Sequence, residues 1–381
     1  MPDQPAVLIA AASGRALAQS ARHGGYLPLV ADFFADQDTA ALAHDHVRIE
    51  GGLARGMNED GLLSAFEALA RSRQPIGAVC GTGFEDRPEL LARIGERWRL
   101  LGNDPQIVGR VKDPRAFATL CRDCAIPHPE TVPSLPLDAV GWLAKRKGGA
   151  GGSHIASAIG QNTANDEFYF QRTTPGVPVS ALFLADGRRA MTLGFSTQWA
   201  SPTTRRPFRY GGAVRPAALA PALAHTLADA INRLVQAIPL VGLNSADFLV
   251  HGDEFRLLEI NPRPGATLDV FEPAQGSLFA LHVAACQGEL DCKLDCAPPR
   301  FDGACAAAIV YAERDIAAVP AVRWPDWAAD RPHSGTAIKA GEPLCSVTAA
   351  AATAAAARAG VDERLAVVLA MVRDWTHAGM S

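Results

Sequence analysis

The hydrophobic positions at the start of the chain form short apolar runs that alternate with helical segments. These runs cover residues 6–12, 27–31 and 76–80, and the segments that separate them have helical character or contain turn residues. Strands that alternate with helices form a parallel sheet that is covered on both faces. The pattern therefore predicts an α/β fold, with a first domain over residues 1–110.

The first turn of this domain bears on the ligand that it could bind. The domain is Rossmann-like, but the turn Ser13-Gly14-Arg15 has one glycine where a dinucleotide site has GxGxxG. We therefore do not expect a dinucleotide to bind there.

A helix is expected to join this domain to the rest of the chain. Asp113 can cap the helix, Pro114 suits its first position, and Pro127 and Pro129 prevent it from continuing. Beyond the joint we expect strands and glycine-rich loops, a helix, a hairpin, and a third unit that closes on a helix. The expected domains are 1–110, 111–297 (lid roughly 130–190, central lobe 191–297) and a small β-rich cap at 298–381, with a helix near 216–237, the hairpin at 246–261 and the last helix at 364–375.

Composition and charge exclude several classes of protein. Of 381 residues, 48% are hydrophobic and 20% are charged, and the formal net charge is −4. A near-neutral chain has no electrostatic footprint for nucleic acid or an anionic membrane, so a polyanionic ligand requires a local patch. No apolar run reaches the roughly 18–20 residues of a membrane helix. The first apolar run also lacks the preceding Lys or Arg of a secretory signal, so we expect a cytoplasmic protein.

The eight cysteines do not have the pattern of a metal site or a disulfide scaffold. Cys121 and Cys124 form one CxxC pair, whereas a zinc ribbon needs two such pairs at matched spacing. We interpret the cysteines as small buried hydrophobic residues. The remaining loose cluster consists of Cys286, Cys292, Cys296 and Cys305.

A glycine-rich segment follows the strand-like residues 142–145. Its four glycines, Gly148, Gly149, Gly151 and Gly152, allow the backbone to approach a ligand and to direct N–H groups at an anion. Lys145 would supply a point charge. The spacing does not match the GxxxxGK[ST] pattern of a P-loop. A phosphate cradle and a flexible surface linker both remain open for this segment alone.

A second candidate site lies on the predicted hairpin. Glu259 and Asn261 are two positions apart on a strand and therefore point to one face, with Asp247 across the hairpin. Their oxygens suit Mg²⁺ that is shared with nucleotide phosphates. An exposed polar face is the alternative. Because Asp247 and Glu259 are 12 positions apart, a shared metal requires an odd-length loop or a bulge between them.

Taken together, these signals resemble the ATP-grasp superfamily across most of the chain. The matching pieces are Lys112 opening the linker helix, Lys145 before a glycine-rich lid, and Glu259-x-Asn261 followed by Arg263 in Asn-Pro-Arg-Pro. The branch that it resembles most is that of the ATP-dependent carboligases related to biotin carboxylase. That closer resemblance rests on residues 80–85, 101–103, 334–338 and 341–343.

Some positions depart from the superfamily pattern. Residues 168–173 resemble the hinge strand whose backbone meets adenine, but Gln171 stands where an acidic residue is often found. Arg146 replaces the proline common after the lid lysine, and Asp247 stands where many relatives have glutamate. We interpret the departures at Arg146 and Asp247 as variation, because neither removes a charge or a donor type.

The resemblance implies an ATP-grasp fold, ATP, and Mg²⁺ or Mn²⁺. It assigns Asp247, Glu259 and Asn261 to the metal and makes Arg263 and Lys145 catalytic, with Arg263 holding an acyl phosphate. A structural ion pair is the alternative for Arg263. The implied nucleotide-binding residues are Lys112, Lys145, Gly148, Gly149, Gly151, Gly152, Ser153, Gln171, Arg172 and Thr173.

The resemblance also implies a reaction, in which a carboxylate attacks ATP to give an acyl phosphate that an amine converts to an amide. A tyrosine-like amino acid and a glutamate-type partner, in cofactor biosynthesis, are the substrates we expect. Arg205, Arg206 and Arg209 would recognise the acidic partner unless their loop is merely solvated, and His154 would touch ligand. The alternatives are a carboxylase that uses bicarbonate and a non-catalytic nucleotide-binding module. We expect no nucleic-acid or membrane partner, and a homodimer is compatible with the sequence.

Overall fold

The computed structural model describes residues 4–52, 56–160, 167–289 and 299–378. The first lobe is built on a parallel sheet with strand order β3-β2-β1-β6, as the apolar runs predict. The buried strand β1 pairs with β2 on one side and β6 on the other. The strands of the first lobe are β1 (Ala6–Ala10), β2 (Leu27–Asp32), β3 (Asp45–Arg48) and β6 (Pro75–Cys80). Its helices are α1 (Arg15–His23), α2 (Gln37–Leu42), α3 (Glu59–Ser72) and α4 (Pro88–Gly95). A small antiparallel ladder pairs β4 (Gly51–Gly52) with β5 (Gly56–Met57).

Two helices form the joint after this lobe. Helix α6 (Pro114–Asp123) begins as predicted, because the Asp113 carboxylate accepts the N–H groups of residues 115 and 116. Helix α5 (Pro105–Lys112) was not predicted, although it has the same signal of a capping Asp104 before a proline. Lys112 therefore ends α5, and the prediction that it opens the linker helix is wrong.

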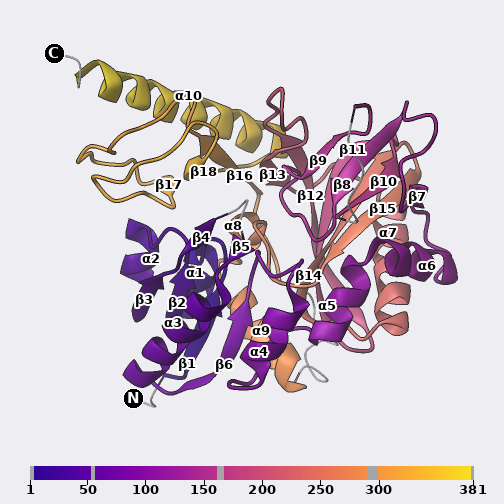
Figure 1. The fold of residues 1–381 in the computed structure, drawn as a ribbon, viewed down its shortest axis with the longest axis horizontal. Coiled ribbons are helices and arrows are strands. Elements are labelled where there is room, and N and C mark those ends of the chain that lie inside the picture. Colours follow the sequence, from indigo (N-terminus) through magenta and orange to yellow (C-terminus); the bar gives the residue numbers. More distant parts are fainter. Residues whose placement is uncertain (1–3, 53–55, 161–166, 290–298, 379–381) are drawn as a thin grey trace.

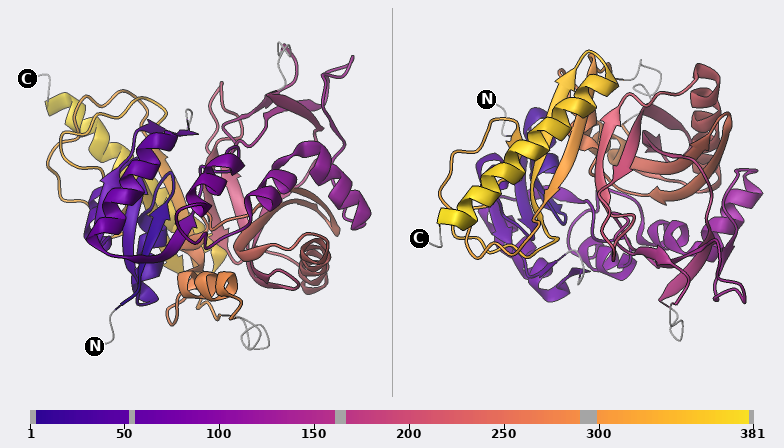
Figure 2. Two further views of the ribbon diagram at one scale, coloured as in Figure 1. Left: turned by 60° about the horizontal axis from the view of Figure 1, so that its bottom comes forward. Right: turned by 90° about the horizontal axis from the view of Figure 1, so that it is seen from above.

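A small antiparallel sheet with strand order β7-β10-β8-β9 follows and projects from the body of the molecule (Figure 2). The glycine-rich turn, residues 147–154, connects β8 to β9. We call this sheet with its turn the lid. Its strands are β7 (Thr131–Val132), β8 (Trp142–Arg146), β9 (Ile155–Ser157) and β10 (Phe168–Arg172).

An eight-stranded sheet forms the rest of the molecule, in the order β15-β14-β11-β12-β13-β16-β18-β17. The predicted hairpin is β14 and β15, and the C-terminal strands extend the same sheet through pairing of β13 with β16. Its strands are β11 (Val177–Asp186), β12 (Ala190–Ala200), β13 (Tyr210–Arg215), β14 (Val241–His251), β15 (Glu254–Asn261), β16 (Ala304–Tyr311), β17 (Ala328–Ala329) and β18 (Pro343–Ala351).

Alternating side chains of β11 bury both faces of this sheet. Phe183 belongs to the core that includes Leu227 of helix α7, whereas Leu182 and Leu184 belong to the core that includes Phe279 of helix α9. The last helix, α10, lies along β16 and β18 (Figure 1). It begins ten residues before the predicted Arg364, because the alanine-rich segment before that residue is also helical. The helices are α7 (Pro221–Ala237), α8 (Leu268–Phe271), α9 (Leu278–Gln287) and α10 (Ala354–Ala378).

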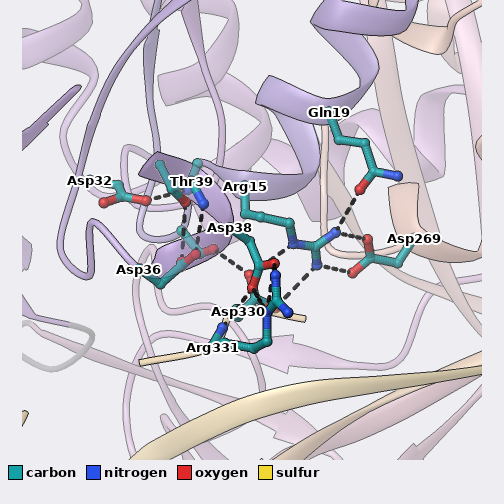
Figure 3. Close-up of polar contacts among 11 residues, drawn as sticks. Arg15, Gln19, Asp32, Asp36, Asp38, Thr39, Asp269, Asp330 and Arg331 are labelled. Carbon is teal, nitrogen blue, oxygen red and sulfur yellow. Dashed lines mark hydrogen bonds and ion pairs between the residues drawn. The ribbon is translucent and has the colours of Figure 1, made fainter. Parts of the chain in front are cut away.

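A buried arginine joins the first lobe to two other parts of the chain (Figure 3). Arg15, only 4% exposed, donates to both carboxylate oxygens of Asp269 in α8 and to those of Asp330 after β17. Burial opposes its charge, but the two carboxylates raise the pKa of Arg15 above its ordinary value. The three units are therefore held together at one point.

Among the cysteines, Cys292 and Cys296 lie outside the described residues. The described cysteines are free thiols at positions 80, 121, 124, 286, 305 and 345.

Candidate active site

The hairpin places its acidic residues on one face. Asp247 of β14 is paired directly with Glu259 of β15, while Phe248 is paired with Leu257, so Leu258 forms a bulge. Directly paired residues of antiparallel strands point to the same side. The bulge that a shared site requires is therefore present, and Asn261, two residues after Glu259, lies on that face too.

The oxygens of this face are joined by short hydrogen bonds. Asp247 accepts from Ser180 Oγ at 2.6 Å and from Asn261 Nδ2 at 2.9 Å. Lys112, from the end of α5, places its Nζ 2.9 Å from Asn261 Oδ1 and 3.3 Å from Glu259 Oε2. The Lys112 ammonium thus already contacts two of the three predicted metal ligands.

The two carboxylates differ in their tendency to ionise. Burial and the neighbouring Glu259 charge raise the pKa of Asp247. Burial also opposes ionisation of Glu259, but the positive charges of Lys112 and Lys145 lower the pKa of that carboxyl below its ordinary value. The charged groups of this site therefore shift one another's pKa values, as is common at functional sites.

The donor set fits a Mg²⁺ ion that also binds phosphate. Two carboxylates and one amide oxygen are hard ligands, and Mg²⁺ usually takes one or two carboxylates and completes its shell with phosphate and water. Within the described ranges, no three Asp, Glu, His or Cys side chains cluster in a way that could hold a metal by themselves. Asp247, Glu259 and Asn261 are consequently suited to a shared metal and not to a closed structural site.

Lys145, on β8 of the lid, is close enough to this face for the charges of Glu259 and Asp247 to act on it. It is 7% exposed, and its Nζ donates to Gln171 Oε1 at 2.6 Å. The Gln171 amide in turn donates to Thr131 Oγ1 on β7. Burial lowers the pKa of Lys145, although Glu259 and Asp247 oppose that shift. Gln171 thus gives the buried ammonium a neutral partner where an acid is common in the superfamily.

The glycine-rich turn contacts two other parts of the molecule. Gly148 has a φ of +65° and passes so close to Asp86 that a Cβ atom would lie 2.2 Å from the Asp86 Cβ. Gly152, with a φ of +69°, leaves even less room beside the Phe208 carbonyl oxygen. Arg146 also approaches Asp86, with 3.9 Å between Nη1 and Oδ2. The lid in this conformation is therefore closed against the first lobe.

One pocket lies between the lid and the hairpin. His154 faces it, and burial with the nearby lysines lowers the pKa of that imidazole to about 4, so it is neutral near pH 7. Several predicted residues line this pocket together. They are Lys112, Gly148, Gly149, His154, Gln171 and Glu259, with Arg146, Tyr169, His128 and Thr131 beside them.

Other predicted residues lie away from the pocket lining. The side chain of Arg172 is stacked over Trp142, with its Cζ 5.5 Å from the ring centroid, and Thr173 and Ser153 are exposed. Arg205 and Arg206 are exposed on their loop. Arg209 is only 6% exposed; it donates to Ser201 and to the Gly341 carbonyl and lies over Tyr311. The guanidinium of Arg209 therefore already has several partners in the fold.

Arg263 has a partner that the sequence analysis did not identify. Its Nε and Nη2 lie 2.7 and 2.6 Å from Glu85 Oε1, in the loop after β6. The structural ion pair considered for Arg263 is thus present. Ser180, Thr131 and Asn103 were also missed, because each reaches its partner from a distant part of the chain. The segments at 80–85 and 101–103 were noted only as resemblances, without a role.

Comparison with known proteins agrees with this geometry. Residues 116–267 match the family model of the ATP-grasp domain. The carbamoyl phosphate synthase large chain of Rubrobacter xylanophilus is 24% identical over an alignment of 234 positions, which covers 55% of this chain and 22% of the synthase. The chain thus spans under a quarter of that curated relative.

Solved structures of ATP-grasp enzymes share the fold over nearly the whole chain. The biotin carboxylase domain of Hydrogenobacter thermophilus 2-oxoglutarate carboxylase, a dimer with MgADP and bicarbonate, superposes with a TM-score of 0.68 at 12% identity, covering 91% of this chain and 86% of that one. N5-carboxyaminoimidazole synthase of Aspergillus clavatus, with ADP and 5-aminoimidazole ribonucleotide, has a TM-score of 0.66 at 13% identity, covering 97% and 100%.

These findings identify the class of protein. The chain contains an ATP-grasp domain and has the fold of the biotin carboxylase-like ATP-grasp enzymes, as the sequence resemblance predicted. None of the helices in the described part of the chain is both long and apolar enough to cross a membrane.

Proposed function

We propose that the protein is an ATP-dependent ligase that joins a carboxylate to an amine. One observation carries this proposal. Lys112 contacts Glu259 and Asn261, and the buried Lys145 is close enough for the charges of Glu259 and Asp247 to act on it, with Arg263 two residues beyond Asn261. Phosphoryl transfer needs positioning and charge neutralisation more than covalent help from the protein, and these side chains can supply both.

The proposed reaction has two balanced steps. A carboxylate oxygen attacks the γ-phosphorus of ATP, and the bond to ADP breaks. The amine nitrogen then attacks the acyl carbon, and phosphate leaves with one oxygen from the original carboxylate while the amine loses a proton. We assign the lysines to the nucleotide phosphates and Arg263 to the acyl phosphate, where its planar guanidinium suits paired oxygens. One or two Mg²⁺ ions, held by Asp247, Glu259 and Asn261, would neutralise phosphate charge.

For the substrates we propose a tyrosine-like amino acid and a glutamate-type partner, in cofactor biosynthesis. The exposed Arg205 and Arg206 would face the acidic partner, whereas the buried Arg209 would fix the shape of their loop. A homodimer is supported by the dimeric state of the 2-oxoglutarate carboxylase domain.

A second candidate function is carboxylation with bicarbonate. It is favoured by the fold, because the two structures described above were solved with bicarbonate or with an aminoimidazole ribonucleotide. Both reactions share ATP cleavage to ADP and phosphate, so the co-substrate must distinguish them.

The deciding experiment supplies the purified protein with MgATP, an ¹⁸O-labelled carboxylate and a panel of amines. The expected result is one ADP for each amide and transfer of one ¹⁸O into phosphate. Phosphate release with bicarbonate alone would favour the carboxylase. Formation of AMP and pyrophosphate would refute an acyl phosphate, and nucleotide binding without any turnover would indicate a non-catalytic module.

A further inference from the structure

Two sequence segments of the first lobe converge on one arginine of the central lobe. Glu85 follows β6 and Asn103 precedes α5, and both are 3% exposed. Both contact the Pro262-Arg263 dipeptide directly after β15. We propose that Glu85 is a positioning residue which, with Asn103, fixes the orientation of the Arg263 guanidinium for the acyl phosphate. This inference rests on the proposed ligase function.

The Glu85 carboxylate is held on both oxygens. Oε1 accepts from Nε and lies 2.6 Å from Nη2 of Arg263. Oε2 accepts the backbone N–H groups of Gly83 at 2.7 Å and Phe84 at 3.0 Å. The side chains of Glu85 and Arg263 are only 3% and 13% exposed. A buried charged pair with this geometry restricts the guanidinium to one orientation.

Only a carboxylate satisfies this arrangement. Each oxygen of Glu85 faces two donor nitrogens, so both must act as acceptors. Glutamine has the same length, but its NH₂ group would face either two backbone donors or the guanidinium. Burial opposes the charge of Glu85, yet Arg263 and Lys112 lower the pKa of its carboxyl below the ordinary value, so it is ionised at neutral pH.

Asn103 fixes the backbone beside the same arginine. Its amide donates to the Pro262 carbonyl at 2.9 Å and to Asn244 Oδ1 at 2.8 Å, and its own oxygen accepts the Val241 N–H at 2.8 Å. The main chain and one edge of the guanidinium are thus both anchored to the first lobe. In the part of the chain that is described, Nη1 of Arg263 makes no hydrogen bond and can donate to a ligand.

The test compares Glu85→Gln with a control that breaks a different ion pair of the same interface. Asp269→Asn weakens the pair with Arg15 six residues beyond Arg263 and does not touch Arg263. The measurements are kcat for amide formation, KM for ATP, the ratio of ADP to amide, and Tm. A residue that only stabilised the fold would change Tm without changing the ratio.

We expect Glu85→Gln to lower kcat by about 100-fold, as misplacement of a catalytic group does, with an unchanged KM for ATP. The ratio of ADP to amide should rise above one, because an acyl phosphate that is poorly held is lost to water. Glu85→Asp, which keeps the charge, should shift the ratio less and serves as the test should Glu85→Gln not fold. Asp269→Asn should lower Tm and leave the ratio at one. A wild-type ratio and kcat in the Glu85 variants would overturn the proposal.

Failure of the proposed function has a different signature, since the wild type would then form no amide at all. In that case inorganic phosphate with MgADP is the probe. A phosphate-dependent rise in Tm that Glu85→Gln loses and Asp269→Asn keeps supports positioning of Arg263 toward an anion. An equal rise in all three proteins, or none in the wild type, overturns it.

Discussion

Closure of the lid against the first lobe can be tested at a single glycine. In Gly148→Ala the new Cβ would lie 2.2 Å from the Asp86 Cβ, whereas ordinary contacts begin at 3.4 Å. The lid must therefore move by about 1 Å, a displacement that can reduce the rate of a positioned reaction by roughly 100-fold. The backbone also resists the change, because a φ of +65° costs alanine about 1–2 kcal/mol.

Gly151→Ala is the matched control. Gly151 has the same φ of +65°, but nothing lies within 4 Å of the position that its Cβ would take. Although the family resemblance implied a nucleotide contact for Gly151, this residue lies outside the pocket lining, unlike Gly148. The two variants therefore share the backbone cost and differ in the contact with Asp86. Any difference in activity between them isolates the docking of the lid.

The assays are calorimetric binding of MgADP, kcat/KM for ATP, and Tm. We expect both variants to lose similar stability. Gly151→Ala should bind MgADP almost as the wild type does, whereas Gly148→Ala should lose most of its affinity and turnover. Equal affinity and turnover in the two variants would show that the conformation in contact with Asp86 is not the one that binds nucleotide.

Three further predictions concern charged groups. Glu259→Gln and Asn261→Asp should impair turnover far more than folding, because Glu259 lines the pocket and both side chains contact the Lys112 ammonium, not the hydrophobic core. Parallel losses of Tm and activity would argue against a ligand role. Asp36→Asn tests pH dependence. Burial and the neighbouring acids raise the pKa of Asp36 to about 7. Protonation of this carboxyl therefore stabilises the folded state in full below the pKa of the unfolded chain, near 4, and this stabilisation is lost as the pH rises from there through 7. Urea titrations should therefore show the stability of the variant relative to the wild type rising between about pH 4 and about pH 7 and staying level above that, with a total change of at most about 4 kcal/mol, and the absence of a pH-dependent difference would contradict this reasoning. Arg15→Met leaves Asp269 without its buried partner and should cost about 3–5 kcal/mol of unfolding free energy in the same titrations, whereas a loss below about 1 kcal/mol would mean that water replaces the pair.

The parts of the site that the sequence predicted are those with a local signal. Glu259 and Asn261 share a face because a strand has a period of two, and Asp113 marks the joint because a cap acts within three residues. The spacing of Asp247 and Glu259 predicted a bulge or an odd-length loop between them, but the position of the bulge at Leu258 is set by pairing with β14. Helix α7 begins at Pro221, five residues after the predicted start, although a proline at the first helical position is itself a local signal.

The residues that sequence reasoning missed act across the fold. Glu85 meets Arg263 over 178 positions, and Asn103 meets Pro262 over 159. No period or cap relates residues at such separations, and their partners follow from how the lobes dock. Arg209 shows the opposite error, because an arginine-rich loop suggests solvent exposure while this side chain is buried against Gly341 and Tyr311.

The distribution of contacts indicates which part of the site is anchored firmly and which part is held by fewer contacts. The segment from Pro262 to Glu272 is anchored to the first lobe at four points: Asn103 at residue 262, Glu85 at 263, Arg15 at 269 and Ser20 at 272. Among the described residues, the lid reaches the same lobe through the approach of Gly148 to Asp86 and the partly exposed ion pair of Arg146 with Asp86 at 3.9 Å. Exposed pairs of this kind contribute about 0–1 kcal/mol, far less than the buried anchors. Opening of the lid would therefore separate Lys145 from the hairpin while Arg263 stayed in place, so nucleotide could enter and leave without disturbing the proposed acyl phosphate site.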